Sequence, residues 1–510
     1  MHEASLQQEE TGLSIGSRCA AFKQNPPRIA QILQAPVYAV AMKLLTVGLA
    51  LVCAVSAGSS RPAAQQTTSP LVLTTERAIA ATISETRMVE TVRRLVGFGT
   101  RMYGTPSNHE SAAWLADQFR GAGLEVTIRK DAARDWYQPV KWDVSVKPTE
   151  ANGAAVALTT TWPGIGATPA TGEGDLAIDA APGAVCLTSK NPTPDATAGC
   201  VAVLFDGRTS ASGWPGVSRL RGTWTIPVFS LSPRESAPLR EKVAAGTKVR
   251  VSFALEARRG NDSADTVVAT LPGKDRSRYI LFCAHGDSDS GGPGADDNAS
   301  GVATVLEIAR AAAAALKAGT MPQPAWDLRF VAWGGEMSST RQYLASAAAD
   351  PSGLQAVINF DQAGFGASKD ALYVEPDDIP VNSPIITIVR SVMKDHLGAK
   401  GFPSHAASVK SQGGTDSYVF QNTRTPGATL YPAVTLYTSA WDTSQTVPVT
   451  AGFPPLNWYP GEKPGTITVD GDPFYHSAGD TPGHTTDTEP FDMGWCARVG
   501  LLSARRLMGQ

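Results

Sequence analysis

Apolar segments that alternate with helical patterns dominate residues 279–363 of this chain. "YILFCAH" (279–285), "DLRFVAW" (327–333) and "LQAVINF" (354–360) are short and apolar, which is typical of buried strands. Helical patterns lie between them, of which "SGVATVLEIARAAAAALKAG" is the longest. Strands that alternate with helices favour a parallel sheet with helices on its faces. We therefore predict an α/β fold with a mixed, largely parallel sheet flanked by helices.

The amino-terminal segment has a different character. The stretch "MKLLTVGLALVCAVSAGSS" begins at Met42, carries one lysine and an apolar run, and ends in small residues. This pattern is typical of a secretory signal peptide with cleavage after Ala57, and its apolar run is too short to span a membrane comfortably. We expect residues 1–41 to be an over-long gene prediction, 42–57 a signal peptide and 58–75 a flexible leader. The mature protein is then secreted or periplasmic, with no membrane span after signal removal.

Residues 150–260 differ from the segments on either side of them. Short β-like runs such as "GCVAVLF", "TIPVFSLS" and "TKVRVSFAL" alternate there with turns rich in glycine and proline. This composition predicts a separate β-rich domain, which leaves residues 76–149 and 261–510 for the α/β domain. Cys186 and Cys200 lie 14 positions apart inside this segment and could pair in an oxidising compartment.

Two helices and a strand are expected before that segment. A helical pattern runs from about Ser84, and a second one starts near Asn108, which we expect to cap it. Glycines 121 and 123 are placed to stop the second helix, and a strand is expected at residues 124–128.

Residues that bind metal ions follow several of the expected strands. His285, Glu336 and Asp361 come at or just after the three apolar runs, Asp297 precedes a helix, and His476 lies in a late loop. Ligands of open α/β sheets collect beyond the carboxyl ends of the strands. Imidazole and carboxylates are ligands that zinc accepts with one position left for water, and a neighbouring acid can act as general base. The sequence therefore predicts a zinc site at this edge of the sheet, although an aspartate before a helix is more often only a cap.

Several other classes of function are excluded or disfavoured. Lys and Arg number 44 against 47 Asp and Glu, and no basic block is present, so nucleic acid is not expected as a partner. The chain has neither a Gly-x-Ser-x-Gly elbow nor a phosphate-binding loop, which disfavours serine-hydrolase and nucleotide chemistry. The remaining histidines have no partner in the strand-end pattern, and we expect surface or capping positions for His109, His396, His405 and His484.

The segment "AHGDSDSGGPGADDNASGVATVLEIAR" resembles the signature of the co-catalytic zinc aminopeptidases of clan MH. That group includes secreted leucine aminopeptidases, glutamate carboxypeptidase II and the related glutaminyl cyclases. The resemblance extends over about residues 80–510 and includes "GGTDSYVF" and "YHSAGDTP". The β-rich segment is similar to the protease-associated domain that is often inserted in these enzymes. The resemblance implies a zinc exopeptidase fold and an exported zinc metallo-exopeptidase, most of all an aminopeptidase, acting on peptide or protein substrates.

The same resemblance implies a set of metal ligands. His285 and Asp361 would hold one zinc ion, His476 would hold another, and Asp297 would bridge the two. The family also tends to have a cis peptide bond after the bridging aspartate, here between Asp297 and Asn298.

The catalytic residues implied by the resemblance are Asp287 and Glu336. Asp287 would orient His285 by a hydrogen bond, and Glu336 would act as general base. The family has two adjacent glutamates where this chain has Glu336 and then Met337, and a thioether is a poor partner for zinc beside oxygen and nitrogen ligands. Either Glu336 is the base and the second zinc has lost a ligand, or Glu336 is the ligand and the base is missing. The ungapped Trp-Gly-Gly-Glu register favours the first alternative, which leaves one zinc ion or two.

Two other functions stay open. A one-zinc enzyme similar to glutaminyl cyclases tolerates Met337, but those enzymes usually lack the inserted domain. A catalytically impaired binding protein on the same fold predicts the loss of several ligands, whereas one expected position is altered here.

Overall fold

The computed structural model describes residues 68–510 except 149–153, 221, 289, 347–350, 367–368, 413, 422–428 and 460–464. The expected gene-prediction extension (1–41) and signal peptide (42–57) lie outside the described residues. Helix α1 (Pro70–Ala80) occupies the last part of the expected leader, so the prediction of a flexible segment is wrong there. Ser69 caps this helix by accepting a hydrogen bond from the N–H of Val72, and Pro70 stands in the first turn, where it costs no hydrogen bond.

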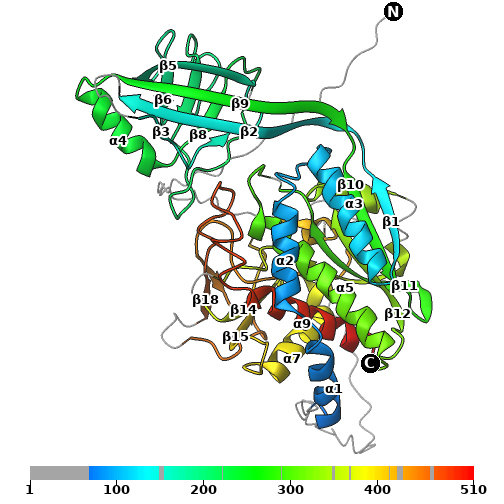
Figure 1. Cartoon of the computed structure of the whole chain (residues 1–510). Coiled ribbons are helices and arrows are strands. Elements are labelled where there is room, and N and C mark those ends of the chain that lie inside the picture. The colour runs from blue at the N-terminus through cyan, green and yellow to red at the C-terminus, as the bar shows by residue number, and fades with distance from the viewer. Residues whose placement is uncertain are drawn as a thin grey trace, which may run out of the picture. The chain divides into compact units, whose positions relative to one another are not determined.

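A mixed sheet forms the centre of the α/β part, with the strand order β1-β10-β12-β11-β13-β16-β14-β15 (Figure 1). Neighbouring strands pair in parallel from β12 through β11 and β13 to β16, and again between β14 and β15, whereas the other pairs are antiparallel. The prediction of a mixed, largely parallel sheet is confirmed. The strands are β1 (Glu125–Lys130), β10 (Asp265–Leu271), β11 (Asp275–His285), β12 (Trp326–Trp333), β13 (Leu354–Phe360), β14 (Ala371–Glu375), β15 (His405–Ser408) and β16 (Ala433–Tyr437).

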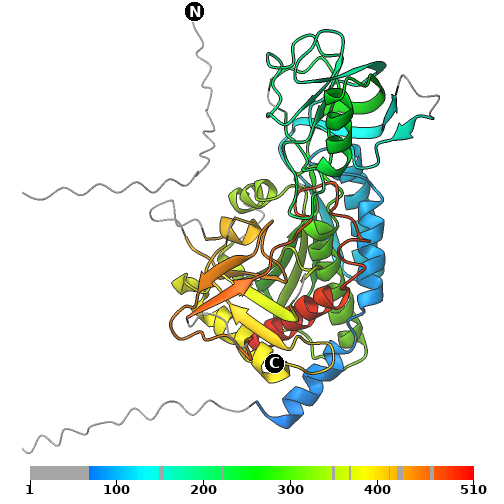
Figure 2. The same ribbon diagram turned by 90° about the vertical axis from the view of Figure 1, so that its left-hand side faces the viewer.

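Helices cover both faces of this sheet, and the strand β11 shows why. Alternate residues point to opposite faces of a strand, so Ile280 and Phe282 join the core that contains α5, while Leu281 and Cys283 join a second core that contains Tyr343 of α6. Helix α9 contacts α5 and the strands β14 and β16, as the view from the side shows (Figure 2). The helices are α2 (Glu85–Val96), α3 (Pro106–Gly121), α5 (Gly301–Lys317), α6 (Ser338–Ala345), α7 (Ser383–His396), α8 (Asp416–Val419) and α9 (Phe491–Leu507), with single turns at η1 (Ala295–Ser300), η3 (Pro351–Gly353) and η4 (Pro380–Asn382).

The start of α3 differs from the prediction. Thr105 caps the helix by accepting a hydrogen bond from the N–H of Asn108, and Pro106 occupies the first turn. The side chain of Asn108 instead donates to the backbone oxygen of Gly334, next to the strand end that precedes Glu336. Asn108, the residue expected to cap α3, therefore links this helix to the turn that follows β12.

A second sheet contains the β-rich segment, with the strand order β3-β2-β9-β5-β6-β7-β8-β4. Its long strands β2 and β9 pair antiparallel and continue directly into β1 and β10 of the central sheet (Figure 1). The sheet thus begins at Arg134, earlier than the expected 150, and Cys186 and Cys200 form a disulfide bond within it. The strands are β2 (Arg134–Pro148), β3 (Val156–Ala157), β4 (Trp162–Pro163), β5 (Ala170–Ile178), β6 (Val185–Thr188), β7 (Ala202–Phe205), β8 (Val228–Ser230) and β9 (Val249–Asp262), with helix α4 (Pro233–Ala244); a separate hairpin pairs β17 (Gln445–Pro448) with β18 (Thr466–Val469).

In the described part of the chain, the segment Ala295–Lys317 is long and apolar enough to cross a membrane. It includes the core helix α5, and 78% of its apolar window is buried inside the fold. Burial of this kind is typical of the central helix of an α/β domain.

A buried ion-pair cluster joins α1, α7 and α9. Glu76 of α1 is fully buried, and it accepts hydrogen bonds from Arg506 (2.8 and 2.7 Å). Nε2 of His396 lies 2.8 Å from the same carboxylate, and the His396 side chain is also fully buried. The prediction of a surface position for His396 is wrong, because α7 ends against α1.

We predict that Glu76→Gln destabilises the fold most at neutral pH. Burial alone would raise the pKa of Glu76, but its hydrogen bonds with Arg506 and His396 lower it from 4.5 to about 2. The ionised form therefore stabilises the fold above pH 4.5, and this contribution is lost as the pH falls from 4.5 towards 2. Breaking one partner of a buried pair typically costs about 3–5 kcal/mol.

The measurement is calorimetric unfolding of the wild type and the variant between pH 2 and 7. The variant should melt at a lower temperature at pH 7, and the difference should shrink as the pH falls through the acid range. Glu110→Gln, at an exposed position of α3, is the matched control and should not change the profile. Equal melting temperatures of Glu76→Gln and wild type at pH 7 would contradict the assignment.

Candidate active site

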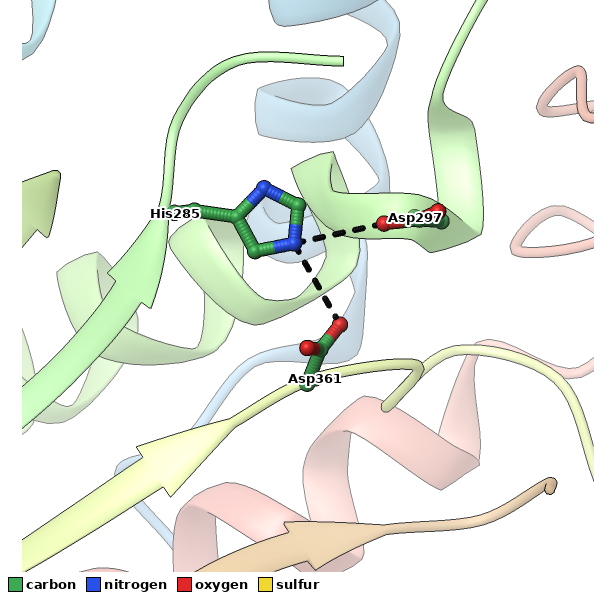
Figure 3. A group of neighbouring side chains, drawn as sticks. All are labelled: His285, Asp297 and Asp361. Carbon is green, nitrogen blue, oxygen red and sulfur yellow. Dashed lines mark ion pairs between the residues drawn. The ribbon is translucent and has the colours of Figure 1, made fainter. Parts of the chain in front are cut away.

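The ends of adjacent parallel strands bring His285, Asp297 and Asp361 together. His285 is the last residue of β11, Asp361 follows β13, and Asp297 lies in the turn that leads into α5. Nε2 of His285 faces both carboxylates, at 3.3 Å from Oδ1 of Asp297 and 3.5 Å from Oδ1 of Asp361 (Figure 3). All three side chains are buried, and one ligand atom of each lies within 4.8 Å of the others.

His476 completes the group of predicted ligands. Its Nε2 lies 3.0 Å from Oδ2 of Asp297, so the two oxygens of Asp297 face two different imidazole rings. A carboxylate in this arrangement can bridge two metal ions. The peptide bond between Asp297 and Asn298 is cis, as the resemblance implied.

This group fits a divalent metal ion. Ligand atoms 2.0–2.1 Å from one tetrahedral ion lie about 3.3 Å apart, close to the separations found here. Oδ1 of Asp361 is buried and has no hydrogen-bond partner among the described residues. Burial by itself lowers the pKa of His285, but Asp361 and the other carboxylates raise it well above its usual value. The site therefore stabilises positive charge at the point where these atoms converge.

Asp287 links the imidazole of His285 to Glu336. Its Oδ1 lies 3.2 Å from Nδ1 of His285 and accepts a hydrogen bond from the N–H of Glu336 (3.0 Å). A carboxylate that holds the far nitrogen of a histidine fixes the ring with Nε2 turned toward a metal. The expected contact between Asp287 and His285 is thus present.

The glycines after β12 let Glu336 reach the site. A Cβ atom on Gly335 would lie 2.4 Å from Cδ2 of Tyr103, and one on Gly334 would lie 2.8 Å from Cβ of Ala264. Larger residues would push the strand end away from these neighbours. Glu336 lines a cavity of about 180 Å³ together with Asp297 and Asp361, so the strand delivers its acid next to the metal-binding group.

Met337 stands at the edge of this cavity. Its N–H donates to Oδ1 of the buried Asp416 (2.7 Å), and its thioether lies beside Gly414, which lines the cavity. Asp416 therefore supports the turn that carries Glu336 and Met337.

Comparison with known families agrees with this geometry. The model of the peptidase M28 family matches residues 266–498, which contain every residue of the site. Residues 266–498 are therefore similar to peptidase family M28. The matched region includes the central sheet from β10 onward and the first eight residues of α9.

Individual relatives share part of their length with the chain. It is 27% identical over 285 residues to the probable lipoprotein aminopeptidase LpqL of Mycobacterium tuberculosis, covering 52% of this chain and 55% of LpqL. It is 30% identical over 169 residues to leupeptin-inactivating enzyme 1 of Streptomyces exfoliatus, covering 32% of this chain and 35% of that enzyme. The chain thus spans about half or less of the length of these curated relatives.

Solved structures share the M28 fold more completely. A peptidase M28 precursor from Shewanella amazonensis superposes with a TM-score of 0.56 at 17% identity, covering 86% of this chain and 97% of its own. The zinc aminopeptidase BSAP from Bacillus subtilis superposes with a TM-score of 0.52 at 18% identity, covering 83% and 95%. At such identities the likeness establishes the fold alone.

Three supporting residues escaped the sequence analysis. Asp480 accepts hydrogen bonds from the N–H groups of Asp296 (2.8 Å) and Asp297 (3.1 Å), and Thr415 donates its hydroxyl to Asp361. Arg101 is fully buried and donates to the backbone oxygens of Gly286, Pro293 and Gly294. Asp480 lies in "YHSAGDTP", Thr415 lies in "GGTDSYVF", and Arg101 lies just before α3. The resemblance therefore covered the segments that contain these residues but did not predict their contacts.

We predict that His285→Ala removes most of the bound metal. The purified chain should contain a divalent metal by elemental analysis, and the variant should lose it because the central ligand is missing. Asp287→Ala should keep the ligands but weaken metal affinity about 10–100-fold, as partners of metal-bound histidines typically do. His405→Ala, on β15, is the control and should retain the wild-type metal content. Full metal occupancy in His285→Ala would contradict the site.

Proposed function

We propose that this protein is a zinc-dependent aminopeptidase. The observation that carries the proposal is the position of Glu336, whose side chain lines both the small cavity with the metal-binding group and a larger cavity of about 870 Å³. An exopeptidase needs a small pocket for one terminal residue and an open space for the rest of the peptide, with the scissile bond between them. The match to peptidase family M28 and the aminopeptidase names of several relatives support this reading.

The charges of the small cavity favour an amino rather than a carboxyl terminus. Asp297, Glu336 and Asp361 line it together with the rings of Trp441 and Tyr475. With zinc bound, Asp297 and Asp361 would balance the charge of the metal, so the carboxylate that attracts a positive amine and repels a substrate carboxylate is that of Glu336. The aromatic rings offer apolar surface for the side chain of the first residue.

His285 and Asp361 would hold one zinc ion and His476 another, with Asp297 contributing one oxygen to each. Zinc, when bound, polarises a substrate carbonyl and makes a water molecule more acidic. The carboxylate of Glu336 accepts the proton of the attacking water and delivers it to the nitrogen of the leaving peptide. Asp287 fixes both ends of this arrangement, because its Oδ1 contacts His285 and the backbone of Glu336.

Met337 weakens the second zinc position in this proposal. The thioether beside Gly414 occupies the place where the family has a carboxylate, so His476 and Asp297 are left without a third charged ligand. An enzyme with one firmly held zinc ion, including one with glutaminyl-cyclase-like chemistry, is the alternative that this residue favours. A catalytically impaired binding protein is less consistent with the convergence of the four predicted ligands, Asp287 and Glu336.

We further propose that the protein is secreted or periplasmic and that the segment from β2 to β9, residues 134–262 in place of the expected 150–260, forms a protease-associated domain. The disulfide bond between Cys186 and Cys200 favours an oxidising compartment, where such bonds form and persist. A relative named as a lipoprotein and a structural neighbour named as a precursor are consistent with export. The catalytic domain would then comprise residues 70–133 and 263–510, in place of the expected 76–149 and 261–510.

Hydrolysis of aminoacyl-p-nitroanilides tests the proposed activity. The wild type should cleave substrates with a free amine but not their N-acetylated forms, and a chelator should abolish turnover. Glu336→Gln should lower kcat about 10²–10⁴-fold, because proton transfer by a general base contributes that much. Glu110→Gln is the matched control. Bound zinc without turnover of any aminoacyl substrate would reject the aminopeptidase and favour a binding protein.

Substitution of Met337 tests whether Glu336 stands in the position of the general base and Met337 in that of the missing zinc ligand. Met337→Glu should raise the zinc content per chain, because it adds a carboxylate at the edge of the small cavity. Met337→Leu, which keeps the volume without a charge, should leave the zinc content unchanged. An unchanged stoichiometry in Met337→Glu would show that Glu336 is not in the position of the base.

A further inference from the structure

The larger cavity beside Glu336 is unusually rich in arginine. Arg134 from the start of β2, Arg259 from the end of β9, Arg219 from a loop of the second sheet and Arg341 from α6 all line this cavity of about 870 Å³. These residues are distant in sequence, yet they share one cavity with Glu336.

Two of the four arginines, Arg259 and Arg134, contact uncharged groups. Nη2 of Arg259 donates to the backbone oxygens of Gly166 (2.6 Å) and Ala167 (3.1 Å). The guanidinium of Arg134 lies over the ring of Tyr103, 3.3 Å from its centroid. Among the described residues, no carboxylate forms an ion pair with Arg134, Arg259 or Arg341. These three guanidinium groups are therefore not fixed in a salt bridge, although the charge of Arg134 also acts on the nearby Asp131.

The carboxylates of the same cavity already have other contacts or roles. Asp135 accepts a hydrogen bond from Asn261 (2.7 Å), and Asp287 is engaged with His285 and the backbone of Glu336. Four guanidinium groups thus face three carboxylates among the described lining residues, and two of these carboxylates belong to the proposed catalytic group. Guanidinium groups bind carboxylates through paired hydrogen bonds, which makes them suited to peptide acids.

We propose that this arginine cavity binds carboxylates of the substrate on the leaving-group side of the scissile bond, so that the enzyme prefers acidic peptides. This inference rests on the proposed aminopeptidase function. With the amino-terminal residue in the acid-lined small cavity, the chain passes Glu336 and enters the larger one. An extended peptide advances about 3.3–3.6 Å per residue, so the acids that reach the arginines belong to the next few residues or to the carboxyl terminus of a short peptide.

Kinetics with matched peptides tests the preference. Leu-Glu-Glu-Ala and Leu-Gln-Gln-Ala have the same shape and differ in charge. The full-length wild type should cleave the acidic peptide with a kcat/KM about tenfold or more above that of the neutral one, mainly through KM, because hydrogen bonds between charged groups contribute at least this much. The ratio should fall toward one in Arg341→Gln and in Arg134→Gln, and partly recover in Arg341→Lys.

Amidation of the carboxyl termini of both peptides shows whether the arginines bind acidic side chains or the terminal carboxylate. A preference that survives amidation assigns the contact to acidic side chains, and one that disappears assigns it to the terminal carboxylate; both outcomes support the arginine cavity. Arg120→Gln, at an exposed position of α3 outside the cavity, is the matched control and should keep the wild-type ratio.

A binding measurement keeps this inference distinct from the proposed activity. Fluorescence anisotropy with labelled acidic and neutral peptides is carried out on Glu336→Gln, alone and combined with Arg341→Gln. Tighter binding of the acidic peptide that is lost in the double variant supports the inference even where no peptide is cleaved. Equal binding of both peptides, or equal kcat/KM for both in the wild type, overturns it while leaving the aminopeptidase proposal intact.

Discussion

Burial of β11 on both faces is the constraint on which the rest of the structure depends. Its residues pair in register with β12 on one side and β13 on the other, with Ala284 opposite Ala332 and Cys283 opposite Asn359. A shift of one residue in either pairing would turn apolar side chains to the wrong face, so the packing of two cores fixes where the strands end. The site inherits its rigidity from this packing, because His285 ends β11 while Glu336 and Asp361 closely follow the neighbouring strands β12 and β13.

Such a site gathers negative charge that the fold must balance. The buried carboxylates of Asp287, Asp297 and Asp361 lie close together, and Asp480 holds the backbone of the turn that carries Asp297. Arg101 lies behind this turn, where burial lowers its pKa to about 10, and attraction to the nearby aspartates opposes that effect. A buried charge is tolerated only when it is paired or well hydrogen-bonded. Arg101 therefore offsets part of this charge, and a cation held by Asp297 and Asp361 would offset more.

The sequence predicted those features that depend on local pattern. The alternation of apolar runs and helices gave the parallel strands, and the polar residues after these runs placed His285, Glu336 and Asp361 at one edge of the sheet. The resemblance added Asp297 and His476, whose side chains lie close together in the structure. What it missed depends on contacts between distant segments. His396 looks like a polar residue at a helix end, and only the approach of α1 buries it against Glu76. Asn108 has the composition of a cap, but Thr105 precedes the helix-starting proline and takes that role. The arginines of the larger cavity lie on segments far apart in the chain, and no periodicity relates them.

The second sheet is part of the site as well as an addition to the fold. A loop between β7 and β8 contains Val217 and runs beside the loop of His476. The N–H of Val217 donates to the backbone oxygen of His476 (3.0 Å). Pro215 accepts a hydrogen bond from the N–H of Ala478 in the same pair of loops (3.0 Å). Because β2 and β9 also supply Arg134 and Arg259 to the larger cavity, the same segment contacts the loop of His476 and forms a wall of this cavity. In the proposed enzyme, substrate selection and the placement of His476 would therefore both depend on this segment, and a change in its packing would affect both.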